Sequence, residues 1–61
     1  MIGQKIKHFR KQKRLTQLEL ANKLGISDVC ISRWENGINI PNLCNILKLA
    51  QALGVNVNQL C

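Results

Sequence analysis

Two complete helix signals follow one another in the stretch LTQLELANKLGISDVCISRWENG, residues 15–37. Thr16 followed three residues later by Glu19 is a capping box, in which each side chain accepts a hydrogen bond from the other residue's backbone N–H. Gly25 can adopt the left-handed conformation that ends a helix. Ser27 is a second N-cap residue, and Gly37 ends the helix that it begins. The stretch therefore predicts two short helices joined by a tight turn, which leaves few folds open.

Apolar residues continue at helical spacing on both sides of this pair. Residues 2–13 carry Ile2, Ile6 and Phe9 on one side. Asn42 begins a helix over 42–53 that Gly54 closes, and its apolar side is broad enough to pack on two neighbours: Leu43, Ile46, Leu47, Leu49, Ala50 and Leu53. A weaker capping box predicts a short fifth helix at Asn56 to Leu60. No segment alternates with a period of two, so the predicted fold is all-α, one five-helix domain over 1–61 with a helix-turn-helix at about residues 17–36.

Charge indicates the kind of partner. The chain has 61 residues, with nine Lys and Arg against three Asp and Glu, a net charge of +6. A surplus of this sign favours a polyanion, either nucleic acid or an anionic membrane. The membrane alternative is the weaker one, because the apolar stripe of residues 2–13 stops after three residues. Six of the basic residues lie within the first fourteen positions, and Lys5, Lys7, Lys11 and Lys13 among them are equally compatible with a solvated face.

Composition argues against an enzyme, a metal site or a secreted protein. Each of the three acids (Glu19, Asp28 and Glu35) has a local structural role, and His8 has no evident nucleophile partner. The cysteines are odd in number and widely spaced, which fits neither a disulfide framework nor the paired ligand spacing of a zinc site. No signal peptide opens the chain and no run is long enough to span a bilayer. We expect a cytoplasmic protein without a cofactor.

The segment from Asp28 to Glu35 has two different sides. Cys30, Ile31 and Trp34 share a side that we expect to be buried. The opposite side carries a mixed set, in which the short Asp28, Val29 and Ser32 lie beside Arg33. In a helix-turn-helix the first helix braces against the DNA backbone, and the second presents its N-terminal side chains to base edges in the major groove. Short side chains of this kind permit such a close approach.

The same stretch resembles the helix-turn-helix of the XRE family, the class of phage repressor and Cro DNA-binding domains. The flanking IGQKIKHFRKQKR and PNLCNILKLAQALGVNVNQL are similar to that family's first helix and last two helices, so the likeness spans essentially the whole chain. It implies a lambda-repressor-like fold. It also implies a transcriptional regulator that binds double-stranded DNA and reads palindromic operators as a dimer.

The resemblance also implies roles for single residues. Base contacts would come from Asp28, Val29, Ser32 and Arg33. Phosphate contacts would come from Gln17, Arg10, Asn36 and Asn42. Arg10 and Glu35 match a pair that bridges the first and third helices in similar proteins. The C-terminal helix, with Val57 and Leu60, resembles a dimer surface and predicts weak self-association that tightens on DNA.

Several of these assignments have alternatives. Arg33 could anchor on a phosphate or be a surface charge, and Val29 could be ordinary surface. Asp28 could stabilise its own helix through the positive end of the helix dipole and not accept a hydrogen bond from cytosine. Residues 36–41 often carry Lys or Arg in relatives but read NGINIP here, which argues against a backbone contact through that loop. The alternative function is an antitoxin or other interaction module whose main partner is a protein.

Overall fold

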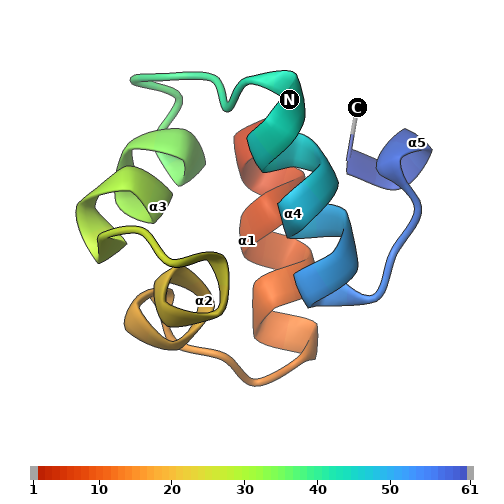
Figure 1. Ribbon diagram of the computed structural model, residues 1–61, viewed down its shortest axis with the longest axis horizontal. Helices are drawn as coiled ribbons and strands as arrows, with labels where there is room; N and C mark the ends of the chain where they lie inside the picture. The colour runs from red at the N-terminus through yellow and green to blue at the C-terminus, as the bar shows by residue number, and fades with distance from the viewer. Residues whose placement is uncertain (1, 61) are drawn as a thin grey trace.

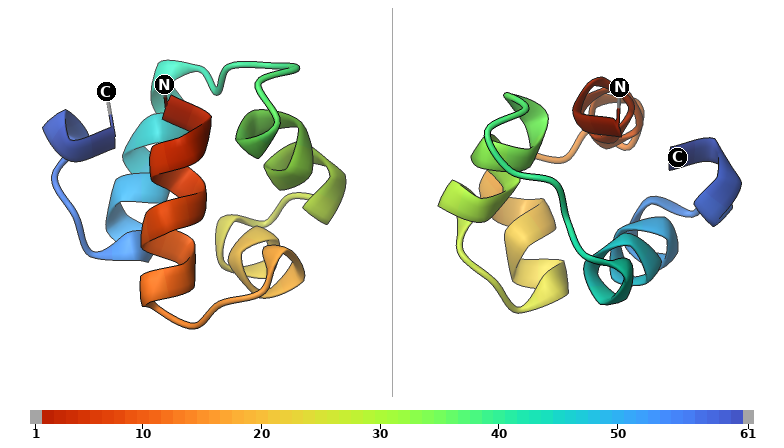
Figure 2. Two further views of the ribbon diagram at one scale, coloured as in Figure 1. Left: turned by 180° about the vertical axis from the view of Figure 1, so that it is seen from behind. Right: turned by 90° about the horizontal axis from the view of Figure 1, so that it is seen from above.

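The fold is all-α, as predicted. The computed structural model describes residues 2–60, which contain five helices and no strand. Their bounds are α1 Ile2–Gln12, α2 Gln17–Leu24, α3 Asp28–Glu35, α4 Leu43–Leu53 and α5 Val57–Leu60. Helices α1 and α4 run side by side through the middle, with α2 and α3 on one flank and α5 on the other (Figures 1 and 2). None of the helices described in 2–60 has the length and apolar character needed to cross a membrane.

Local signals set most helix ends. The Thr16 hydroxyl accepts from the Glu19 N–H at 3.0 Å, and the Glu19 carboxylate accepts from the Thr16 N–H at 2.9 Å, which completes the capping box of α2. The Asn42 side chain accepts from the Asn45 N–H at 2.9 Å at the start of α4. Gly25, with φ 71°, ends α2 in the left-handed conformation that a side chain would disfavour. These contacts confirm the predicted starts and stops.

Two local predictions need correction, and a third is confirmed in part. Ser27 stands at the N-cap of α3, but its hydroxyl makes no capping bond to the backbone and lies 3.7 Å from the Cys30 sulfur. Helix α1 ends at Gln12, one residue early, because Arg14 takes a positive φ of 57° and the chain turns there. At α5 the Asn56 N–H donates to the Gln59 side chain at 2.8 Å, so one arm of the weaker capping box forms.

The core lies between all five helices. The predicted buried side of α3 is confirmed for Ile31 and Trp34, while Cys30 is half-buried against the core. Helix α2 packs on α3 and α4, and α1 contacts α3, α4 and α5. The buried apolar residues are Ile6, Leu20, Ala21, Leu24, Ile31, Trp34, Leu49, Ala50, Leu53 and Leu60.

The apolar side of α4 is narrower than predicted. Leu49, Ala50 and Leu53 are buried, but Leu43 is 67% exposed and Leu47 is 49% exposed. These two leucines lie four residues apart on one side of the helix, at the border of the buried side. The prediction that the whole apolar set packs on neighbouring helices was wrong, because no described helix covers that side of α4.

Candidate nucleic-acid interface

One side of α3 faces outward. Helix α3 lies at the flank of the molecule farthest from α5, next to α2 (Figures 1 and 2). On this side Asp28 and Arg33 are exposed, Val29 is 53% exposed and Ser32 is half-buried. Within residues 2–60 the side chains of Asp28 and Arg33 make no hydrogen bond or ion pair. Their polar atoms are therefore available to a partner.

A buried ion pair joins the inner side of α3 to α1. Arg10 of α1 donates from Nε to the Glu35 carboxylate at 2.6 Å and from Nη2 at 3.2 Å. The side chains of Arg10 and Glu35 are only 10% and 2% exposed. Arg10 also donates to the Leu15 carbonyl oxygen at 2.7 Å, which ties in the turn before α2. This bidentate contact is the geometry in which arginine binds carboxylate most strongly, and the predicted bridge between α1 and α3 is confirmed.

Gln17 joins the same carboxylate. Its Nε2 donates to Glu35 Oε1 at 3.1 Å, so the first residue of α2 is tied to the last residue of α3. This bond was not predicted from the sequence, which indicated only a phosphate contact for Gln17, since no local pattern connects residues 18 apart. One amide hydrogen of Gln17 is used by Glu35, which leaves the second for another acceptor.

Two further amides stand near α3 or α4 termini. Asn36 is exposed just past α3 and donates from Nδ2 to the Ser32 hydroxyl at 3.3 Å. Asn42 uses its carbonyl oxygen to cap α4, so its NH₂ group is not needed for the cap.

Arg10 differs from these residues, because its burial leaves little of the guanidinium to meet a phosphate. The structure confirms the structural role of Arg10, and its phosphate contact stays a prediction.

A close contact between α1 and α3, which was not predicted from the sequence, sets the position of α3. Gly3 of α1 is buried, and a Cβ placed there would overlap the Trp34 carbonyl oxygen and lie 3.0 Å from the Glu35 carbonyl oxygen. Glycine is required wherever two backbones approach this closely. A glycine inside a predicted helix with an otherwise ordinary pattern is the signal that could have identified this contact.

The predicted dimer residues do not form an exposed apolar surface. Leu60 is 0% exposed and belongs to the monomer core, so its prediction as an interface residue was wrong for the side chain. Val57 is half-buried against the same core. The exposed side chains of α5 are the polar Asn58 and Gln59.

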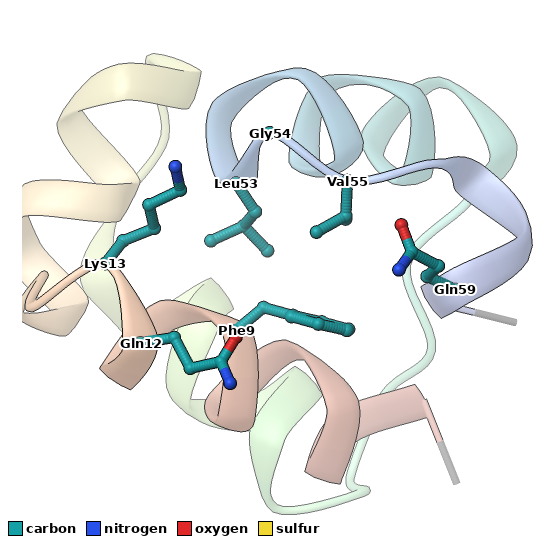
Figure 3. Close-up of a pocket in the computed structure, with 7 residues that line it drawn as sticks. All are labelled: Phe9, Gln12, Lys13, Leu53, Gly54, Val55 and Gln59. Carbon is teal, nitrogen blue, oxygen red and sulfur yellow. The ribbon is translucent and has the colours of Figure 1, made fainter.

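An open hollow of about 630 Å³ lies on the other side of the molecule, between α1 and the α4–α5 turn (Figure 3). Phe9 lies across it, with Leu53 and Val55 pointing toward the ring. Lys13 is the one ionisable residue in its lining, so the hollow has no acid–base or nucleophile pair. Among the described residues, no three His, Cys, Asp or Glu side chains gather as metal ligands; Cys61 lies outside that range. Cys30 and Cys44 are free thiols.

Known proteins share this arrangement. The structure of the P22 c2 repressor in complex with a synthetic operator superposes with a TM-score of 0.93 and 35% identity, covering 98% of this chain and 91% of that one. The restriction-modification controller protein C.AhdI from Aeromonas hydrophila also superposes with a TM-score of 0.93 and 35% identity, covering 98% of this chain and 87% of the other.

Sequence comparison agrees. The transcriptional repressor RstR of the cryptic phage CTXphi in Vibrio cholerae is 32% identical over 60 residues, which cover 98% of this chain and 54% of that repressor. The Repressor protein C2 of Salmonella phage P22 is 38% identical over 53 residues, covering 87% of this chain and 24% of the relative. The chain thus spans about half of one repressor and about a quarter of the other. The sequence profile of the helix-turn-helix family matches residues 6–60. The chain belongs to the helix-turn-helix family, in its XRE class.

Proposed function

We propose that this chain binds double-stranded DNA in a sequence-specific manner as a transcriptional regulator, with α3 in the major groove. The observation that carries the proposal is the outward side of α3, where Asp28, Val29 and Arg33 are exposed on a helix locked from behind by the Arg10–Glu35 pair. A rigid support matters because base reading requires side chains held in one register. The similarity to a repressor solved on its operator gives independent support.

Each exposed side chain of α3 has a chemical match on a base edge. Arg33 can donate two hydrogen bonds to guanine O6 and N7, the commonest specific contact in the major groove. Val29 offers an apolar contact to a thymine methyl group, and Asp28 can accept from cytosine N4. The Ser32 hydroxyl can donate to or accept from a base edge, although it already accepts a hydrogen bond from Asn36.

Phosphate contacts would fix the register of α3. In this proposal the second amide hydrogen of Gln17 and the NH₂ groups of Asn36 and Asn42 donate to backbone oxygens on either side of the groove. Such contacts position a protein on the duplex without reading its sequence. The net charge of +6 supplies the long-range attraction to DNA.

Two copies would read a palindrome. Each domain measures 24 × 23 × 19 Å, so two of them side by side can present their α3 helices about 34 Å apart to successive major grooves on one duplex face. One copy alone offers few base contacts. Cooperative two-to-one binding is therefore the form that we propose for useful affinity.

Selection of bound sequences from random duplex DNA tests the proposal. We expect enrichment of a palindrome, followed in titrations by a linear fall of log affinity with log salt concentration. Arg33→Ala should change the selected sequence, whereas Lys48→Ala removes the same charge from an exposed position on α4 and should leave it unchanged. Failure to enrich any sequence would contradict the proposal and favour the protein-interaction alternative.

A further inference from the structure

Four helix ends within residues 2–60 share one hydrogen-bond pattern. At each end, one backbone N–H donates to the carbonyl oxygen three residues earlier, and the next N–H donates to the carbonyl oxygen five residues earlier. The first residue of each such pair is left-handed, with a φ of 57° to 75°. This arrangement is the Schellman motif, which satisfies the last carbonyl groups of a helix. The left-handed residues are Arg14 after α1, Gly25 after α2, Gly37 after α3 and Gly54 after α4.

Arg14 is the exception among these four residues. A left-handed backbone brings Cβ too close to a neighbouring carbonyl oxygen, so glycine is the usual residue in this position of the motif. At Gly25 and Gly37 an added Cβ would meet no atom of the rest of the fold within 4 Å, so the backbone conformation and not a lack of space favours glycine. Within residues 2–60, Arg14 is the one residue other than glycine with a positive φ. Position 14 therefore carries a backbone cost that glycine would remove.

The folded chain makes no use of the Arg14 side chain that would offset this cost. The side chain is exposed, and within residues 2–60 it forms no hydrogen bond or ion pair. A cation does favour the C-terminal end of α1, but Lys11 already stands in the last turn of that helix. Lys11 and Lys13 also repel a further cation at position 14. A partner outside the chain would have to supply the compensating contact.

We propose that Arg14 binds a phosphate of the DNA backbone, beside the phosphate proposed for Gln17. The turn that carries Arg14 crosses from α1 to α2 at one end of the molecule, and α2 begins at Gln17 (Figure 1). Helix α3 lies on the same flank as α2. A guanidinium binds phosphate through two parallel hydrogen bonds. This inference rests on the proposed DNA binding and adds a contact to it.

Arg14 would supply a charge that the other proposed phosphate contacts lack. Gln17, Asn36 and Asn42 are neutral amides, and the guanidinium of Arg10 is buried against Glu35. A cation on a phosphate releases a counterion from DNA, so it strengthens binding and makes binding more salt-dependent. The contact fixes the position of the protein without reading bases. Strained backbone residues are concentrated at ligand contacts of this kind, where the side chain serves the ligand and not the fold.

Three substitutions at position 14 separate the backbone from the charge. Arg14→Gly removes both the strain and the charge, Arg14→Ala removes the charge alone, and Arg14→Lys keeps both. In urea denaturation followed by Trp34 fluorescence, the midpoint for Arg14→Gly should lie above those of the wild type and of the other two variants. The sign is opposite to that in a helix interior, where glycine is less stable than alanine.

DNA binding should follow the charge instead. On a duplex with a single half-site, Arg14→Gly and Arg14→Ala should each bind about 3–10-fold more weakly at about 0.1 M salt, on the selected sequence and on unrelated sequences alike. The slope of log affinity against log salt concentration should fall by about one, whereas Arg14→Lys should keep most of it. Lys48→Ala is the matched control, because it removes the same charge from an exposed position on α4. Its affinity and slope should stay close to those of the wild type.

Uncharged phosphate analogues locate the contact. In a series of half-site duplexes, one phosphate at a time is replaced by a methylphosphonate. At one phosphate, this replacement should weaken the wild type but not Arg14→Gly, because both changes remove the same ion pair. The phosphate at which Gln17→Ala becomes insensitive should be its neighbour on the duplex.

Two results would overturn the inference. The first is an Arg14→Gly variant that loses no more affinity or salt dependence than Lys48→Ala. The second is an Arg14→Gly variant no more stable than Arg14→Ala, because the backbone cost at position 14 would then be absent. A wild type that enriches no sequence would instead refute the proposed sequence-specific function. If its non-specific DNA binding still weakens in Arg14→Gly, the phosphate contact stands.

Discussion

Gly3 of α1 lies directly against the carbonyl oxygen of Trp34 in α3, where a side chain has no room. Alanine in a helix interior normally stabilises relative to glycine by about 0.5–1 kcal/mol. At this position we expect the opposite sign, a loss of about 1–3 kcal/mol, because the two backbones must move apart. Urea denaturation followed by Trp34 fluorescence measures the change. Gln4→Ala, at an exposed position of the same helix, is the control and should have little effect. A stabilised Gly3→Ala variant would show that the close contact does not form.

The Arg10–Glu35 pair should be costly to break from one side. Glu35→Ala leaves a buried guanidinium without its counter-charge and also releases Gln17. We expect a loss of about 3–5 kcal/mol in the free energy of unfolding. The double variant Arg10→Met with Glu35→Leu removes both charges and should recover much of this loss. If the double variant is as unstable as Glu35→Ala, desolvation of the unpaired arginine is not the cause.

Arg33 tests base reading separately from folding. Because its side chain has no partner within residues 2–60, Arg33→Ala should leave the unfolding free energy nearly unchanged. On the selected operator it should cost about 1–3 kcal/mol and relax preference at one base pair, as expected for a guanine contact. Binding measurements on operators with single base changes provide the check. An equal loss on every sequence would reassign Arg33 to a phosphate.

The capping box of α2 should make stability depend on pH. The hydrogen bonds from the Thr16 backbone N–H and the Thr16 hydroxyl lower the pKa of the Glu19 carboxyl in the folded chain. A lowered pKa stabilises the fold at pH values above the ordinary glutamate pKa, and this contribution is lost as pH falls through the folded value. The unfolding free energies of wild type and Glu19→Gln should therefore differ at about pH 7 and converge toward about pH 3. Glutamine preserves the capping box, so a difference that does not change with pH would contradict this account.

Local chemistry made much of the fold predictable. The capping box at Thr16 and the cap at Asn42 join atoms only three residues apart, and Gly25 and Gly54 end their helices through their own backbone conformation. These interactions depend on neighbours in the chain, so a sequence displays them directly. The buried side of α3 followed from the spacing of Ile31 and Trp34 for the same reason.

The candidate site was predictable only in part. The four α3 residues and the Arg10–Glu35 pair were assigned because the chain resembles the XRE family, and the structure confirms the ion pair. The bond from Gln17 to the same carboxylate joins two helices across 18 residues. No pattern within one helix contains that information.

By itself the sequence determined which residues form helices, where four of those helices begin or end, and which side of α3 is buried. Only the tertiary structure decided which apolar surfaces find a neighbour. Leu60 and Leu43 have similar side chains and each lies on a helix, yet Leu60 is fully buried and Leu43 is 67% exposed. The spacing of apolar residues indicates which side of a helix is apolar, but that side is buried only where a second helix packs across it. The crossing is set by contacts between distant residues, such as Gly3 against Trp34.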